Sequence, residues 1–92
     1  MSEFEAAGRL LDRRIEDANG RLVGRVDDLL LDISSGQIEY VLIALRDRSE
    51  VATEIVTVPW SLVQPKTRSR LRWRIGVERT VLERIAADKR SR

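Results

Sequence analysis

The sequence predicts a mostly β fold: a small antiparallel β-barrel of five or six strands, followed by a short C-terminal helix. Residues 20–45 form two apolar runs on either side of Ser34-Ser35-Gly36, as expected for a β-hairpin. Within the second run, Gln37 to Tyr40 alternate between polar and apolar residues, which is the period of a strand with one buried face. From Val77 onward, the apolar spacing lengthens to that of an amphipathic helix.

The ninety-two residues are enough for one domain. Three segments are expected along it: a flexible lead-in at residues 1–8, the β-barrel at 9–76, and the helix with a basic tail at 77–92. Outside the central hairpin, strands are expected at residues 9–17, 54–58 and 70–75. In the first of these strands, Leu11 and Ile15 are the expected core positions. Asn19-Gly20 predicts a type I′ turn, because this turn needs positive φ at both central residues.

The faces of the central hairpin follow from side-chain parity. In its first strand the apolar parity changes at Asp27-Asp28, which a β-bulge at that point would explain. Gly24 is the type of residue that permits a close backbone approach within a strand. In the second strand, continuing the alternation of residues 37–40 predicts an inward set of Ile38, Tyr40, Leu42 and Ala44. The same rule leaves an outward set of Val41, Ile43 and Leu45.

The remaining elements end the barrel. Trp60 follows Pro59, which cannot donate to a strand ladder, and is expected to plug one barrel end. Trp73 shares the inner face of the last strand with Leu71 and Ile75. In the helix, the expected core contacts come from Val77, Val81, Leu82 and Ile85. Thr80 and Glu83 have the spacing of a capping box.

An ordered set of short motifs accompanies these elements between about Leu10 and Ile75. It comprises Asn19-Gly20, Val23-Gly24, Val26, Asp28-Leu29-Leu30, Ser35-Gly36, Ile38-Glu39-Tyr40 and Val58-Pro59-Trp60. In this pattern the chain resembles the PRC-barrel family. The family includes the cytoplasmic domain of the photosynthetic reaction centre H subunit and the C-terminal domain of the ribosome maturation factor RimM. Asp12 departs from the pattern, since a small residue, often Gly, is expected at its position.

The resemblance implies a PRC-type β-barrel that acts as a non-catalytic adaptor and docks on a macromolecular partner. It does not identify the protein partner. Composition is consistent with this reading, because cysteine and histidine are both absent and no catalytic constellation, cofactor motif or metal site can be recognised. No apolar run is long enough for a membrane helix, and the N-terminus lacks a signal-peptide core. We therefore expect a cytoplasmic protein that does not insert into a membrane and is not an enzyme.

Charge is distributed unevenly along the chain. Residues 1–63 carry a net charge of −5 and residues 64–92 a net charge of +7, within an overall charge of +2. An arginine row accounts for part of the basic half and is formed by Arg68, Arg70, Arg72 and Arg74. Its two readings are an internal row paired with carboxylates on neighbouring strands, and a contact for phosphates of RNA or for an anionic partner. The second reading gives the alternative function of an RNA- or ribosome-associated protein.

The outward set of the hairpin predicts self-association. Together with neighbours on the paired strand it gives a candidate apolar dimer patch of Val23, Leu30, Val41, Ile43 and Leu45. Soluble monomers rarely leave such a patch uncovered. Either the C-terminal helix covers it through Val77, Val81 and Ile85, or a second copy does so in a two-fold homodimer with Ile43 near its centre.

Overall fold

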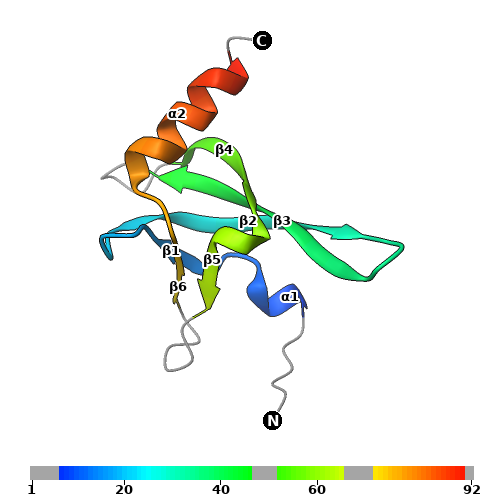
Figure 1. Ribbon diagram of the computed structural model, residues 1–92. Coiled ribbons are helices and arrows are strands. Elements are labelled where there is room, and N and C mark those ends of the chain that lie inside the picture. The colour runs from blue at the N-terminus through cyan, green and yellow to red at the C-terminus, as the bar shows by residue number, and fades with distance from the viewer. Residues whose placement is uncertain (1–6, 47–51, 66–71, 91–92) are drawn as a thin grey trace.

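The computed structural model describes residues 7–46, 52–65 and 72–90 (Figure 1). In chain order the elements are α1 (Ala7–Leu10), β1 (Arg14–Glu16), β2 (Leu22–Asp32), β3 (Gln37–Arg46), β4 (Ala52–Pro59), the 3-10 turn η1 (Trp60–Leu62), β5 (Val63–Pro65), β6 (Arg72–Ile75) and α2 (Arg79–Arg90). The predicted mostly β fold with a short C-terminal helix is confirmed. Where sequence parity placed one strand at residues 9–17, the structure instead has the helical turn α1 and the short strand β1.

The described strands form one six-stranded sheet in the order β4-β3-β2-β1-β6-β5. The sheet is not closed by hydrogen bonds, so it is a barrel only approximately. Its two edge strands, β4 and β5, are consecutive in the chain and are joined by η1. All neighbouring strands pair antiparallel except β1 and β6, which pair in parallel. The parallel pair places the C-terminal part of the chain beside its N-terminal part.

Two register shifts bend the β2–β3 hairpin. The first lies between Val26 and Asp28, which confirms the bulge predicted at Asp27-Asp28. The second lies between Leu30 and Leu31 and was not predicted. β4 pairs with β3 as far as Tyr40, so only beyond the second shift does the hairpin extend away from the rest of the sheet as a two-stranded ribbon (Figure 1).

The core is built from the side of β3 that parity had placed outside. Val41, Ile43 and Leu45 are buried, together with Val23 of β2. Of the set expected to point inward, Ala44 is buried, Ile38 and Leu42 are half-buried, and Tyr40 is exposed. The predicted orientation is therefore wrong, and the outward patch predicted to centre on Ile43 is part of the core.

Gly24 lies where β2 and β3 approach each other most closely. It pairs with Leu45, and a Cβ atom at this position would meet the carbonyl oxygen of Ala44. The expected close backbone approach is confirmed, and no other residue type fits there without moving the strands apart.

The turn between β1 and β2 differs from the predicted type. The Gly20 amide donates to the Asp17 carbonyl oxygen at 3.0 Å, and Gly20 alone of the turn residues has positive φ, at 80°. This is a three-residue loop with a glycine in the left-handed conformation, not a type I′ turn. Asp12 also has positive φ, at 64°, which explains why a glycine would suit its position.

Helix α2 begins at Arg79, one residue before its predicted cap Thr80. The amides of Val81 and Leu82 donate to the Glu78 carbonyl oxygen, so Thr80 lies inside the helix and does not form the expected capping box. Leu82 is fully buried, whereas Val81 is largely exposed. Two further side chains of this segment, Val77 and Ile85, pack against the core cluster that contains Val23, Val41, Ile43 and Leu45. Of the three residues expected to cover the patch within one chain, Val77 and Ile85 thus contact its buried members, whereas Val81 is exposed.

The two tryptophans pack together in the same core. Trp73 and Ile75 are buried on the inner face of β6, as predicted, while Leu71 lies outside the described residues. Trp60 is partly buried and packs edge-on against Trp73, with ring centroids 5.3 Å apart. Both tryptophans therefore belong to the packed interior, as the sequence predicted.

Candidate functional site

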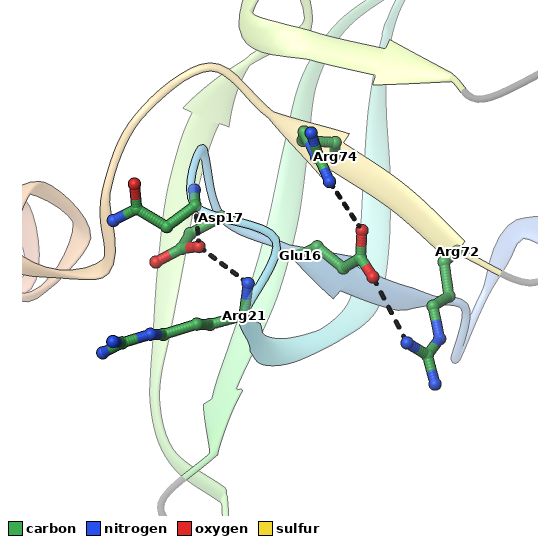
Figure 2. Close-up of polar contacts among 6 residues, drawn as sticks. Glu16, Asp17, Arg21, Arg72 and Arg74 are labelled. Carbon is green, nitrogen blue, oxygen red and sulfur yellow. Dashed lines mark hydrogen bonds and ion pairs between the residues drawn. The ribbon is translucent and has the colours of Figure 1, made fainter.

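The parallel β1–β6 pair brings Glu16 next to the arginine row. Its carboxylate is buried and lies 3.2 Å from Arg72 Nη1 and 3.5 Å from Arg74 Nη2 (Figure 2). A buried carboxylate needs such partners, because desolvation without them costs several kcal/mol. The two row members that the structure describes are thus paired internally. Arg68 and Arg70 lie outside the described residues.

Asp17 ties the first turn to helix α2. Its Oδ1 accepts the Arg21 amide at 3.0 Å (Figure 2). The same oxygen accepts the Asn19 amide at 2.9 Å, and Oδ2 accepts the Arg79 amide at 3.3 Å. The side chain is buried. A carboxylate at a helix N-terminus is stabilised by the unpaired amides there. Sequence analysis assigned no role to this residue, although an aspartate two positions before Asn19-Gly20 is a turn-forming signal.

A second arginine cluster surrounds a surface hollow of about 490 Å³ beside α1 and β1. We call it the arginine hollow. Of the residues that the structure describes, five arginines, one leucine and one aspartate line it: Arg9, Arg13, Arg14, Arg25, Arg72, Leu11 and Asp12. Leu11 is exposed there, which corrects its prediction as a core residue, whereas Ile15 is buried as expected. Sequence analysis missed this cluster, because its arginines come from α1, β1, β2 and β6.

Strand register explains how the hollow forms. Arg14 of β1 has Arg25 as its partner on β2 and Arg72 as its partner on β6. Paired residues on neighbouring strands lie about 4.7–4.9 Å apart and share a face of the sheet. Three arginines therefore stand abreast across three adjacent strands. Like charges directly opposite each other destabilise a sheet, so this arrangement has an electrostatic cost within the chain.

The far part of the β2–β3 hairpin presents an apolar surface of a different kind. We call residues 27–40 the hairpin arm. Leu30 pairs with Tyr40 and Leu31 with Ile38, and the register shift between the two leucines puts all four side chains on one face. Leu31 is 57% exposed, and Ile33 at the tip is 96% exposed.

The tip of the hairpin arm is fixed by Asp32. Its Oδ1 accepts the Ser34 amide and hydroxyl, each at 2.9 Å, and the Gly36 amide donates to its carbonyl oxygen at 2.7 Å. The Ser34 hydroxyl, followed by the Ser34 and Ser35 amides, holds the pKa of the Asp32 carboxyl below its usual value. The turn at the tip is thus ordered although its side chains are exposed.

Comparison with known families decides the classification. The model of the PRC-barrel domain matches residues 2–76, which is most of the chain. The chain belongs to the PRC-barrel family. No curated protein matches it. Membership of the PRC-barrel family supports a small interaction module, and the family's domains are generally non-catalytic.

The residues of this PRC-barrel chain that were predicted to form a dimer patch do not lie together. Of the predicted dimer patch, Leu30 is exposed on the hairpin arm, whereas Val23, Val41, Ile43 and Leu45 lie in the core. The patch is therefore not a continuous surface. Across residues 7–46, 52–65 and 72–90, no group of His, Cys, Asp and Glu side chains is arranged to hold a metal ion. Neither described helix has the length and apolarity needed to cross a membrane.

Proposed function

We propose that this PRC-barrel chain is a docking module whose hairpin arm binds a partner protein with an apolar and basic surface. The observation that carries the proposal is the apolar face of the arm, where Leu30, Leu31 and Tyr40 are exposed on a ribbon that extends from the sheet. A two-stranded ribbon is marginally stable alone, and a partner that covers this face would stabilise it.

The charge of the arm indicates the chemistry of the partner. Residues 26–45 contain four acidic side chains and no basic one. The acidic side chains Asp27, Asp28 and Glu39 are exposed along the arm, with Asp32 near the tip. By register Asp28 shares the apolar face, whereas Glu39 lies on the opposite face of its strand. Complementary potential across an interface favours association with the right partner and disfavours like-charged ones. A basic rim around an apolar patch is therefore the surface that fits the arm.

The same charge argument bears on self-association. A two-fold homodimer through the arms would place two acidic ribbons against each other, which costs free energy unless cations intervene. A homodimer remains the competing proposal, now through the exposed face of the arm and not through Ile43. Sedimentation equilibrium of the isolated chain tests it.

The binding proposal can be tested with a model ligand. We would titrate the ¹⁵N-labelled chain with a peptide of alternating leucine and lysine, and with a leucine–glutamate peptide as the charge control. Amide shifts confined to residues 27–40 and seen only with the lysine peptide are expected. The double variant Leu31→Ser, Ile33→Ser should abolish them, whereas Ile55→Ser, at an exposed isoleucine outside the arm, should not.

Two outcomes would overturn this function. Equal shifts with both peptides, or shifts outside the arm, would remove the charge-matched docking surface. A dimeric chain that the double variant converts to monomer would replace the partner-protein proposal by self-association.

RNA binding through the arginine row has less support. Arg72 and Arg74 both approach the buried carboxylate of Glu16, so their charge is partly neutralised within the chain. Contact with RNA phosphates would compete with this pairing. For the two described members of the row, internal pairing with a carboxylate is therefore the better supported interpretation.

A further inference from the structure

We propose that the arginine hollow is a binding site for a compact polyphosphate group, in which two or more phosphates are linked. The hollow is separate from the hairpin arm, and the proposal does not depend on the docking function. Its volume, about 490 Å³, lies within the range of small-molecule sites.

The charge of the hollow exceeds what a single phosphate neutralises. Among the described residues, five arginines and one aspartate line it, and Glu16 beside the hollow partly neutralises Arg72. One phosphate monoester carries about 1.5 to 2 negative charges near neutral pH, so a single phosphate leaves much of this positive charge uncompensated. Linked phosphates bring further negative charge into the same volume. Guanidinium groups also match phosphate oxygens in pairs of parallel hydrogen bonds, which favours arginine over lysine for this ligand.

Several of the guanidiniums are already held in place. Arg13 lies over the Trp73 ring, 5.3 Å from its centroid, and Arg25 Nη1 lies 3.5 Å from Asp12 Oδ2. Arg72 contacts Glu16. Side chains that are fixed before binding lose less conformational entropy when the ligand arrives. These contacts hold one side of the site in position for an anion.

The two remaining arginines of the hollow are Arg9 and Arg14. Both are exposed, and neither forms an ion pair with any residue that the structure describes. Arg14 also stands between Arg25 and Arg72 in register, which is the least favourable position of the three for a cation. An anion in the hollow would convert this repulsion into attraction. Arg14 is thus the residue on which ligand binding depends most.

The lining also indicates what the ligand lacks. Among the residues that the structure describes, no aromatic side chain lines the hollow, and Leu11 is the one apolar residue there. Single-stranded nucleic acids usually require exposed aromatic platforms for their bases. The Trp73 ring is buried and has Arg13 over it. The hollow therefore recognises phosphate groups without a base, which favours a polyphosphate over RNA.

The test uses inorganic triphosphate as the probe, with isothermal titration of the full chain at about 50 mM salt, where electrostatic contacts are strong. Binding is expected, with affinity falling as salt rises. Inorganic phosphate should bind at least about tenfold more weakly, because it satisfies fewer guanidiniums. Titration with ATP then asks whether a triphosphate within a nucleotide is accepted equally.

The matched variants are Arg14→Gln in the hollow and Arg84→Gln on the exposed surface of α2. Arg14→Gln should weaken triphosphate binding at least about tenfold, while the unliganded variant becomes slightly more heat-stable because a like-charge contact is removed. Arg84→Gln should change neither property. A purely structural role for Arg14 predicts loss of stability and so separates the two explanations.

Three results would overturn the proposal. The first is no triphosphate binding at about 50 mM salt by the folded chain. The second is equal weakening by Arg84→Gln, which would indicate diffuse attraction by net charge. The third is Arg14-dependent binding of single-stranded RNA in the absence of triphosphate binding, which would assign the hollow to nucleic acid.

Discussion

The two halves of the β2–β3 hairpin have similar apolar content but opposite environments. The inner half pairs Val26 with Ile43 and lies in the core, whereas the hairpin arm pairs Leu30 with Tyr40 and leaves both exposed. The difference comes from the rest of the chain, because β4 pairs with β3 only from Arg46 to Tyr40 and leaves the residues nearer the tip without a third strand. Apolar sequence alone therefore does not separate a strand that forms the core from one that is available for contact.

The largest expected difference in the free energy of unfolding comes from truncating one isoleucine in each half of the hairpin. Ile43→Ala removes a fully buried side chain and should lower the free energy of unfolding by about 2–5 kcal/mol. Ile33→Ala, at a side chain that is 96% exposed, should change it by no more than about 0.5 kcal/mol. Urea unfolding followed by circular dichroism measures both. Equal effects would mean that the arm is packed against the body in solution.

The two glycines of the hairpin provide a second contrast. Gly24→Ala places a Cβ against the Ala44 carbonyl oxygen and should cost about 2–3 kcal/mol, because backbone must move. Gly36→Ala meets no atom within 4 Å but requires an alanine at φ 73°, which costs about 1–2 kcal/mol. Thermal unfolding of both variants ranks them. If Gly36→Ala lowers the stability more than Gly24→Ala, the two strands at Gly24 can move apart at little energetic cost.

Hydrogen exchange distinguishes the two halves without any substitution. Amides of the hairpin arm open without unfolding the core, so they should exchange faster than those near Ile43. A tenfold difference corresponds to about 1.4 kcal/mol, and at least that difference is expected. Exchange measured by NMR at neutral pH gives the result residue by residue. Uniform protection across the hairpin would contradict an independent arm.

The smallest effect concerns Asp32 at the tip of the arm. Hydrogen bonds from Ser34 lower its folded pKa, so its contribution to stability is present above its unfolded pKa and is lost as the pH falls through the folded value. Below about pH 4 the wild type should therefore approach the stability of Asp32→Asn. Urea midpoints of both proteins between neutral and acidic pH test this. If the difference in urea midpoint between the two proteins does not change with pH, ionisation of Asp32 does not stabilise the turn.

Much of the fold is predictable from local pattern. The hairpin, the bulge at Asp27-Asp28, the glycine approach and the helix all follow from residue type and spacing. The inner face of β3 was mispredicted for a physical reason. Alternation is visible only at residues 37–40, which belong to the arm, where Ile38 is half-buried and the other three side chains are exposed. Beyond Tyr40 both faces are apolar, so sequence parity does not identify the core side.

The candidate sites were harder to predict from the sequence than the fold. The arginine row was visible because its members alternate along one segment. The arginine hollow joins Arg9, Arg25 and Arg72 from distant segments, and only the strand register brings them together. No role was assigned to Glu16 and Asp17 from the sequence, because burial of a carboxylate depends on partners from β6 and α2.

The parallel β1–β6 pair has a consequence for synthesis of the chain. Arg72 contacts Glu16 across 56 residues, and the Arg79 amide reaches Asp17 across 62. A growing chain therefore displays β1 and the β2–β3 hairpin long before β6 leaves the ribosome, and closing so long a loop slows folding. Until then one side of β1 has no strand neighbour. A chain released before residue 72 would retain that open edge, on which strands of other molecules can assemble.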